Sequence, residues 1–437
     1  MPEWGSSMQQ SAVRSIVTCD LEGRIETFND GAEALFGYSP DEVIGRKRVS
    51  LFSPGLIVLG HVNDWLQAAR NDGEFSTRTA LLRKDGTSFA AQVRITPTYR
   101  RFDGRKELIG YCGTTTALPD VDAEEVMPHI RWATRLMAWM VVTRAPFLTA
   151  TVTPVLIASA WALLQTGIAA FPWGLFVSAL LGAICLQVSA NTFNDYFDWK
   201  SGTDEANADY FVPYTGGSRS IELGLITERA LFRLAMMALA LAALAALPVL
   251  LVRSPGILAF GAAGAALAYF YTAPPLQLSA RRGLGELSIL LAFGPLLTAG
   301  MVYALLGSAD TAAYLVGLPI GLLAVAILWV NQFPDMESDA MTGKNHLLVT
   351  VGKRAARWGY VLLVASAFIS TIVLAMSRVL PLGTLVMLFA LPLAAYSTRI
   401  VFEHYLDREL VRASKATIKL HLICGLLLVA GIIWSAN

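Results

Sequence analysis

Long apolar stretches fill the chain from about residue 147 to its end, and they constrain the fold more than any other feature. Each is roughly 20 residues long, the length of an α-helix that crosses the hydrocarbon core of a bilayer. They raise the hydrophobic share of the 437 residues to 55% and leave charged residues at 15%, which is too apolar for a soluble helical protein. We predict nine membrane-spanning helices, near residues 146–167, 173–193, 231–252, 256–272, 286–306, 311–331, 358–376, 380–400 and 417–435.

The N-terminal part of the chain differs sharply, because its composition is ordinary and polar. It is expected to form a separate soluble domain. The stretch that follows it mixes arginine with tryptophan, as segments lying along a membrane surface do. The predicted division is therefore a soluble domain at 1–117, a linker with an interfacial amphipathic segment at 118–143, and a membrane domain at 144–437.

Other bulk features exclude several classes of protein. A formal net charge of +1 gives no electrostatic reason to expect a nucleic-acid partner. The four cysteines form no C-x-x-C pair, so neither a disulfide framework nor a zinc site is expected. The N-terminus lacks the basic, apolar and small-residue order of a signal peptide, so the soluble domain is expected in the cytoplasm.

Lysine and arginine collect at alternate ends of the predicted spans. Cytoplasmic loops carry an excess of these cations, so their distribution predicts orientation. We expect the N-terminus and the cation-rich loops in the cytoplasm and the C-terminus outside a bacterial-type cytoplasmic membrane. The cations are Arg131, Arg135, Arg144, Lys200, Arg219, Arg229, Arg281, Arg282, Lys344, Lys353, Arg354, Arg408, Arg412 and Lys415.

Two of the predicted cytoplasmic loops are long and begin with carboxylates at the end of a span. The first reads NTFNDYFDWKSGTDEANADYF and the second NQFPDMESDAMTGKNHLL. Within each, polar residues recur at spacings of three and four, which places them on one face of a helix. The first set is Asn191, Asn194, Asp195 and Asp198, and the second is Asn331, Asp335 and Asp339.

Carboxylates three or four residues apart repel each other unless a cation joins them. Oxygen ligands suit Mg²⁺, which commonly bridges one or two carboxylates to a substrate phosphate. A lone acidic cluster is as readily a solvated helix cap. Two clusters on one side of the membrane, each followed by glycines and cations, instead favour a clamp for a diphosphate. Those following residues are Gly216, Gly217 and Arg219 in one loop, and Gly343, Lys344, Lys353 and Arg354 in the other.

At these motifs the chain resembles the UbiA superfamily of intramembrane prenyltransferases, from about Arg144 to the C-terminus. The family motif NDxxDxxxD is matched by Asn194, Asp195 and Asp198, but Gly202 stands where the last Asp is expected and Asp204 follows two residues later. That ending resembles the branch acting on 1,4-dihydroxy-2-naphthoate. The stretches GGSRSIELGLIT, YTAPPLQLSARRGLGELSILLAFGPLLTAG and NQFPDMESDAMTGK point the same way.

The resemblance implies an all-α bundle with a central cavity that is capped by the two acidic loops and open to lipid. It implies Mg²⁺-assisted loss of diphosphate from a polyprenyl diphosphate, attack by an aromatic acceptor on the allylic cation, and proton loss. The predicted catalytic and metal-binding residues are Asp195, Asp198, Asp335 and Asp339, with Asp204 as a further metal ligand. The predicted substrate-binding residues are Asn191, Asn194, Arg219, Tyr271, Asn331, Lys344 and Lys353.

Two other functions remain open at this point. The helical part could have lost catalysis and serve only as a membrane anchor for a sensor, although the intact Asp pairs argue against it. A terpene cyclase would use the same diphosphate clamp without an aromatic acceptor.

Several other polar residues have two interpretations. Tyr271, Ser279, Arg281, Arg282 and Glu286 could line the cavity mouth or could cap a helix and anchor it. His346 is expected to be solvated, because a lone loop His is seldom catalytic. Three aromatic residues interleave the first motif and could steady a carbocation, but packing is the expected role of each; they are Phe193, Tyr196 and Phe197.

The N-terminal domain reads as strands, a short helix entered through Asn29 and Asp30, and later strands joined at Asp85-Gly86. This α+β pattern resembles a PAS domain over about residues 11–116, through FNDGAEALFGYSPDEVIG and RKDGTSF. PAS domains sense ligands, redox state or light, or mediate dimerisation, so activity could be modulated and a PAS-mediated dimer could form. The flavin motif NCRFLQ is absent, and haem is not expected despite His61.

Overall fold

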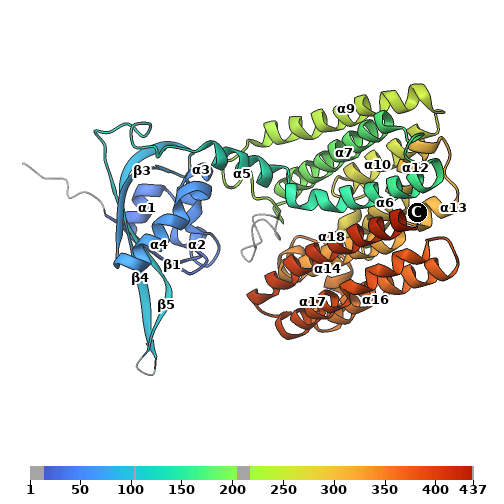
Figure 1. Cartoon of the computed structure of the whole chain (residues 1–437). Helices are drawn as coiled ribbons and strands as arrows, with labels where there is room; N and C mark the ends of the chain where they lie inside the picture. The colour runs from blue at the N-terminus through green and yellow to red at the C-terminus, as the bar shows by residue number, and fades with distance from the viewer. Residues whose placement is uncertain (1–13, 103–104, 204–216, 436–437) are drawn as a thin grey trace, which may run out of the picture. The chain divides into compact units, whose positions relative to one another are not determined.

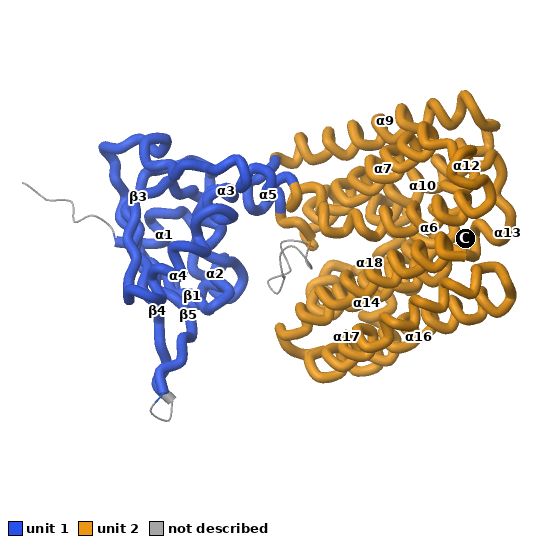
Figure 2. The backbone as a smooth tube through the Cα atoms, in the orientation of Figure 1, with its two compact units in different colours: residues 1–139, 220–226 blue, residues 140–219, 227–437 orange. Residues whose placement is uncertain are grey.

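The computed structural model describes residues 14–102, 105–203 and 217–435, and the chain divides into two compact units. The first comprises residues 1–139 together with 220–226, and the second comprises 140–219 together with 227–437 (Figure 2). A short segment after the first acidic motif therefore belongs to the N-terminal unit, although helices of the membrane domain flank it in sequence.

The first unit is built on a five-stranded antiparallel sheet with strand order β2-β1-β5-β4-β3 (Figure 1). The expected turn at Asp85-Gly86 joins β3 to β4, where the Asp85 carboxylate accepts from the Thr87 N–H at 2.9 Å. The final hairpin is long, since its pairing continues to Phe102 and Arg105. The strands are β1 (Ser15–Asp20), β2 (Ile25–Phe28), β3 (Phe75–Leu82), β4 (Ser88–Phe102) and β5 (Arg105–Ala117).

Short helices pack against this sheet, and the first of them is the one that the sequence predicts. The first begins at an Asn29 cap, whose side chain accepts from the Ala32 N–H, and ends at Gly37 with φ of 78°. An apolar core forms between sheet and helices, in which the rings of Phe36 and Phe52 stack with centroids 4.2 Å apart. The helices are α1 (Asp30–Phe36), α2 (Pro40–Val43), α3 (Gly55–Ile57) and α4 (Asn63–Asp72), and α5 (Trp132–Val142) follows the sheet.

The segment Ser220–Ile226 packs closely within the first unit. Gly55, the first residue of α3, lies so near to it that a Cβ atom there would overlap the Leu223 carbonyl oxygen and meet Leu225 Cδ2 at 2.7 Å. The Leu223 side chain is buried. Glycine is thus required at position 55 for this close approach.

In its described residues, the second unit contains helices and no strands. Helix α14 lies inside the bundle, with Leu323, Val330 and Phe333 almost fully buried, and it packs against α11, α16 and α18. Helices α7 and α9 pack along each other. The helices are α6 (Thr149–Thr166), α7 (Trp173–Lys200), α9 (Glu228–Val252), α10 (Ile257–Phe270), α11 (Leu284–Leu291), α12 (Leu297–Leu306), α13 (Thr311–Leu315), α14 (Leu318–Met341), α15 (Leu347–Val351), α16 (Lys353–Met376), α17 (Leu391–His404) and α18 (Val411–Trp434).

The predicted count of nine spans is not confirmed. Within the described ranges, 8 helices are long and apolar enough to cross a membrane. The stretch predicted at 256–272 forms α10, which has only 14 residues. At 1.5 Å per residue, such a helix covers about two thirds of a hydrocarbon core roughly 30 Å thick.

Candidate diphosphate and acceptor site

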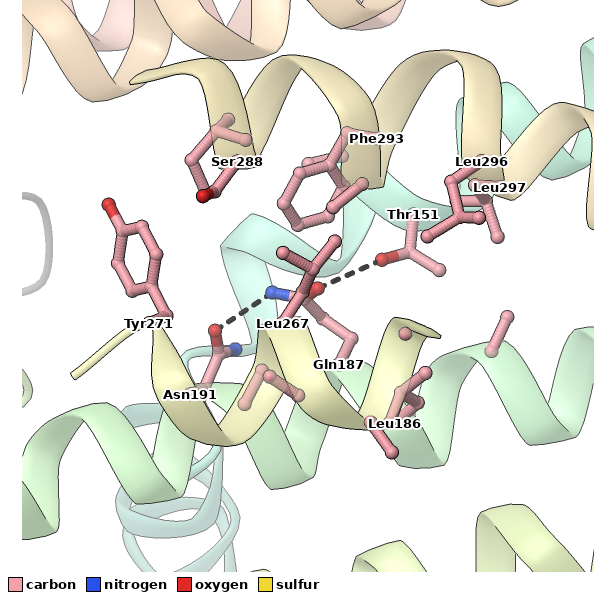
Figure 3. Close-up of a pocket in the computed structure, with 18 of the residues that line it drawn as sticks. Thr151, Leu186, Gln187, Asn191, Leu267, Tyr271, Ser288, Phe293, Leu296 and Leu297 are labelled. Atoms are coloured by element: carbon pink, nitrogen blue, oxygen red, sulfur yellow. Dashed lines mark hydrogen bonds between the residues drawn. The ribbon is translucent and has the colours of Figure 1, made fainter. Parts of the chain in front are cut away.

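A cavity of about 980 Å³ lies within the helical unit, and its walls change character along its length. Apolar residues form most of the lining, many of them leucines, alanines and glycines of α7, α9, α10 and α12, and part of this wall is seen in Figure 3. The carboxylates of the lining come from the C-terminal ends of α7 and α14, and Lys344 and His346 come from the segment that follows α14. An apolar chamber with a polar mouth suits a ligand that has a long hydrocarbon tail and a charged head.

The first acidic motif lies entirely on α7, which continues to Lys200. The Asp195 carboxylate is buried and forms an ion pair with Arg144, the residue just before the first long helix. Its Oδ1 also accepts from the Ser218 N–H at 3.2 Å. Asp195 is thus neutralised before any ligand binds.

Asn191 on the same helix is held on both sides of its amide. Its Nδ2 donates to the Thr143 carbonyl at 3.0 Å, and its Oδ1 accepts from Gln187 Nε2 at 2.8 Å. Gln187 Oε1 in turn accepts from the Thr151 hydroxyl at 3.2 Å (Figure 3). Asn191 and Asn194 both line the cavity.

The second acidic motif lies on the last turns of α14. Asp335 and Asp339 line the cavity mouth. Asp339 Oδ2 lies 3.1 Å from His346 Nε2. His346 Nδ1 accepts from the Val349 N–H at 3.4 Å, so the proton of the neutral ring is on Nε2 and is donated to Asp339.

Lys344 joins the two motifs. Its ammonium lies 2.6 Å from Asp198 Oδ1 and 3.9 Å from Asp339 Oδ1. All three side chains line the cavity. One cation therefore lies between a carboxylate from α7 and a carboxylate from α14, which brings the two distant sequence motifs to one point.

These carboxylates fit the oxygen chemistry of Mg²⁺, although they do not form a complete protein cage. Among the described residues, no group of three or more His, Cys, Asp or Glu side chains is arranged to hold a metal ion. Mg²⁺ does not need one, because it usually binds one or two carboxylates together with substrate phosphates and waters. Asp198, Asp335 and Asp339 could supply those ligands. The predicted ligand Asp204, like Gly216, lies outside the described residues.

The remaining predicted residues divide into two groups. Tyr271 and Asn331 line the cavity. Burial raises the pKa of the Tyr271 hydroxyl, and the nearby Glu286 carboxylate raises it further, so this phenol is protonated. Lys353 does not line the cavity and instead lies 3.5 Å from Glu337. Arg219 is buried with φ of 54° and is likewise absent from the cavity lining.

The structure also shows where the polar residues lie that could either line the cavity mouth or cap and anchor a helix. Ser279 lines the cavity, whereas Arg281 and Arg282 are exposed at the surface. Glu286 is buried behind the wall, where its Oε1 accepts from Gln332 Nε2 and from the Leu347 N–H, both at 3.3 Å.

The aromatic residues of the first motif pack against each other and their neighbours. Phe193 is almost fully buried, with its ring centroid 5.1 Å from that of Tyr269. The ring centroids of Tyr196 and Phe232 lie 5.0 Å apart. Since Phe193, Tyr196 and Phe197 do not line the cavity, packing is their role in this structure.

Sequence reasoning missed three features of the site. His346 was expected to be solvated, which is wrong: only 2% of it is exposed. The sequence predicts Arg144 only as an orienting cation, and it gives no signal for Gln332. The partners of all three lie on other helices or beyond a turn, so no spacing in the sequence could have revealed them.

A bundle with this cavity and these paired acidic motifs belongs to a known class. The profile of the UbiA prenyltransferase family matches residues 155–423, more than half of the chain, and the profile of the PAS domain matches residues 13–115. The chain belongs to the UbiA prenyltransferase family and carries an N-terminal PAS domain. It is an integral membrane enzyme that transfers prenyl groups.

The chain is also similar to individual proteins of the family. The chain is 28% identical to 2-carboxy-1,4-naphthoquinone phytyltransferase of Synechocystis sp. over 72% of this chain and 98% of that protein. It is 32% identical to 1,4-dihydroxy-2-naphthoate octaprenyltransferase of Mycobacterium tuberculosis over 46% of this chain and 66% of that protein. A solved UbiA homolog from Archaeoglobus fulgidus shares the fold, with a TM-score of 0.50 at 15% identity over 68% of this chain and 99% of that one.

Proposed function

We propose that the protein catalyses Mg²⁺-dependent transfer of a polyprenyl group from polyprenyl diphosphate to 1,4-dihydroxy-2-naphthoate within the membrane. The observation that carries this proposal is Lys344 lying between Asp198 and Asp339 at the mouth of an apolar cavity. Relatives named for naphthoate substrates support the choice of acceptor.

The residues at the mouth suit the first step of this reaction. Lys344 offers a cation to the diphosphate as negative charge develops on the leaving oxygen. Asp198, Asp335 and Asp339 would hold Mg²⁺, which when bound neutralises the diphosphate and helps it leave. The apolar walls hold the hydrocarbon tail and keep water from the allylic cation. The C1–O bond to diphosphate breaks, a carbon of the aromatic ring forms a bond to C1 of the prenyl group, and loss of the proton from that ring carbon restores the aromatic ring.

The PAS domain is proposed to modulate this activity. Ser220–Ile226 packs within the PAS-containing unit, and the residues just before it include Ser218, whose N–H donates to Asp195. The chain itself thus connects the sensor to the first acidic motif. We further propose that the N-terminus is cytoplasmic and the C-terminus outside. A PAS-mediated dimer stays a prediction, which cross-linking in the membrane would test.

One assay separates this function from the two alternatives. Membranes containing the full chain are supplied with geranylgeranyl diphosphate, with or without 1,4-dihydroxy-2-naphthoate, and diphosphate release and prenylated product are measured. A prenyltransferase needs the acceptor and forms one product per diphosphate. A terpene cyclase releases diphosphate without the acceptor, and a catalytically silent anchor releases none. Loss of activity in excess EDTA and its return with Mg²⁺ test the metal.

A further inference from the structure

Amide side chains that line the cavity differ in how their hydrogen bonds are satisfied. Gln187 and Asn191 use both the oxygen and the nitrogen of their amides. Hydrogen bonds link Thr151 to Gln187 and Gln187 to Asn191 (Figure 3), and Asn191 Nδ2 donates to the Thr143 carbonyl. By contrast, the amide oxygens of Asn331 and Gln332 on α14, Oδ1 and Oε1, are buried and have no hydrogen-bond partner. Both residues line the cavity.

Glu286 determines which end of the Gln332 amide is free. The Glu286 carboxylate can only accept, and its Oε1 lies 3.3 Å from Gln332 Nε2. The nitrogen must therefore face Glu286, which leaves Oε1 as the free end. Gln332 is only 8% exposed and Glu286 only 7%, so neither is free to turn into bulk water.

A buried acceptor without a donor costs free energy, and a ligand that brings a donor removes that cost. Polyprenyl diphosphate cannot do so, because its hydrocarbon tail has no polar hydrogen and its ionised diphosphate oxygens are themselves acceptors. An aromatic acceptor with a free hydroxyl can. The two unpartnered amide oxygens can therefore accept a hydrogen bond from the aromatic acceptor but not from polyprenyl diphosphate.

We propose that Gln332 is a specificity-determining residue whose Oε1 accepts a hydrogen bond from a hydroxyl of the aromatic acceptor, with Glu286 as the positioning residue that orients its amide. Asn331 Oδ1 offers a second acceptor beside it. The inference rests on the proposed function, since it requires a hydroxylated aromatic substrate. Asn331 is four residues before Asp335, so this end of α14 brings the ring beside the proposed diphosphate site. A hydrogen bond donated by the phenol to Oε1 also polarises its O–H bond, which makes the ring richer in electrons and a better nucleophile.

The test compares 1,4-dihydroxy-2-naphthoate with its two monomethyl ethers, using the full chain in nanodiscs. The wild type is expected to prefer the dihydroxy compound to at least one ether by tenfold or more in kcat/KM. Gln332→Met keeps the side-chain length and removes the acceptor, and it should reduce this preference to within about threefold. KM for the polyprenyl diphosphate should change by less than twofold. Glu286→Gln should weaken the preference by releasing the amide.

Gln187→Met is the matched control, because its oxygen is already bonded to Thr151, and the preference should persist in it. An unchanged preference in a folded Gln332→Met protein would overturn the inference and leave the proposed function intact. A wild type that prenylates no hydroxylated aromatic would refute the proposed function itself. If Gln332→Met does not fold, the wild type alone still tests the inference. A preference for the dihydroxy compound below twofold over both ethers would overturn it, because water would then be the donor to Oε1.

Discussion

The two acidic motifs look alike in sequence but are held in different ways. At the first, Asp195 is neutralised by Arg144 and the Ser218 N–H, and the chain then enters Ser220–Ile226 in the PAS-containing unit. At the second, Asp339 contacts His346 and Lys344 from the turn that follows it. That turn is fixed inside the helical unit, where the Asn345 N–H donates to the Ala280 carbonyl at 2.9 Å. Both motifs are thus held by contacts within the helical unit, but Arg144 and Ser218, the partners of the first, lie within five residues in sequence of segments that belong to the PAS-containing unit.

The largest fall in activity is expected when one carboxylate of the two acidic motifs is removed. Asp198→Asn or Asp335→Asn should lower kcat/KM at least about a thousandfold, because each removes a charged ligand of the proposed metal. Diphosphate release in nanodiscs measures it. Glu337→Gln is the control, since Glu337 is 80% exposed on the same helix and should retain near-normal activity. Equal activity of all three variants would remove the carboxylates from the mechanism.

A smaller effect is expected at the cation that joins the motifs. Lys344→Met should lower kcat/KM by about 10²–10³, the usual cost of losing one group that stabilises developing charge. Lys353→Met is the matched control, because Lys353 pairs with Glu337 and does not line the cavity. The sequence predicts both lysines as substrate ligands, so a comparable loss in Lys353→Met would support that prediction for Lys353 and weaken the role of this geometry.

A His346 variant tests whether the contact of His346 with Asp339 matters for metal binding at the second motif. Removing a group that orients a metal ligand typically costs about 10–100-fold in metal affinity or activity. His346→Ala should therefore weaken Mn²⁺ binding in the presence of inorganic pyrophosphate, measured by electron paramagnetic resonance, with a parallel rise in the Mg²⁺ needed for turnover. His346→Asn, whose amide can still donate, should recover part of the loss. Unaltered Mn²⁺ affinity in both variants would reduce His346 to a packing residue.

How much of this could be predicted depended on the range of the interactions. Residues on one helix face, such as Asp195 and Asp198, follow from a spacing of three or four, and long apolar stretches predict most spans. Two features depend on how distant segments pack. One is the pairing of Arg144 with Asp195, and the other is that Lys344 lines the cavity whereas Lys353 does not. The apolar stretch at 256–272 marks the ends of α10 to within two residues, but a helix of that length is shorter than the roughly 20 residues that a crossing needs.

Gly55 tests the dependence of the first motif on the PAS-containing unit. Any Cβ at this position overlaps the Leu223 carbonyl, so Gly55→Val should displace Ser220–Ile226 and raise its hydrogen–deuterium exchange. The contact of Asp195 with the Ser218 N–H should weaken, and since one hydrogen bond contributes about 0.5–1.5 kcal/mol, activity should fall about two- to tenfold. Gly113→Ala is the control, because its Cβ would meet only the Val17 carbonyl, at 3.8 Å. Faster exchange with unchanged activity would separate the sensor from the first motif, while the proposed chemistry at Lys344 would stand.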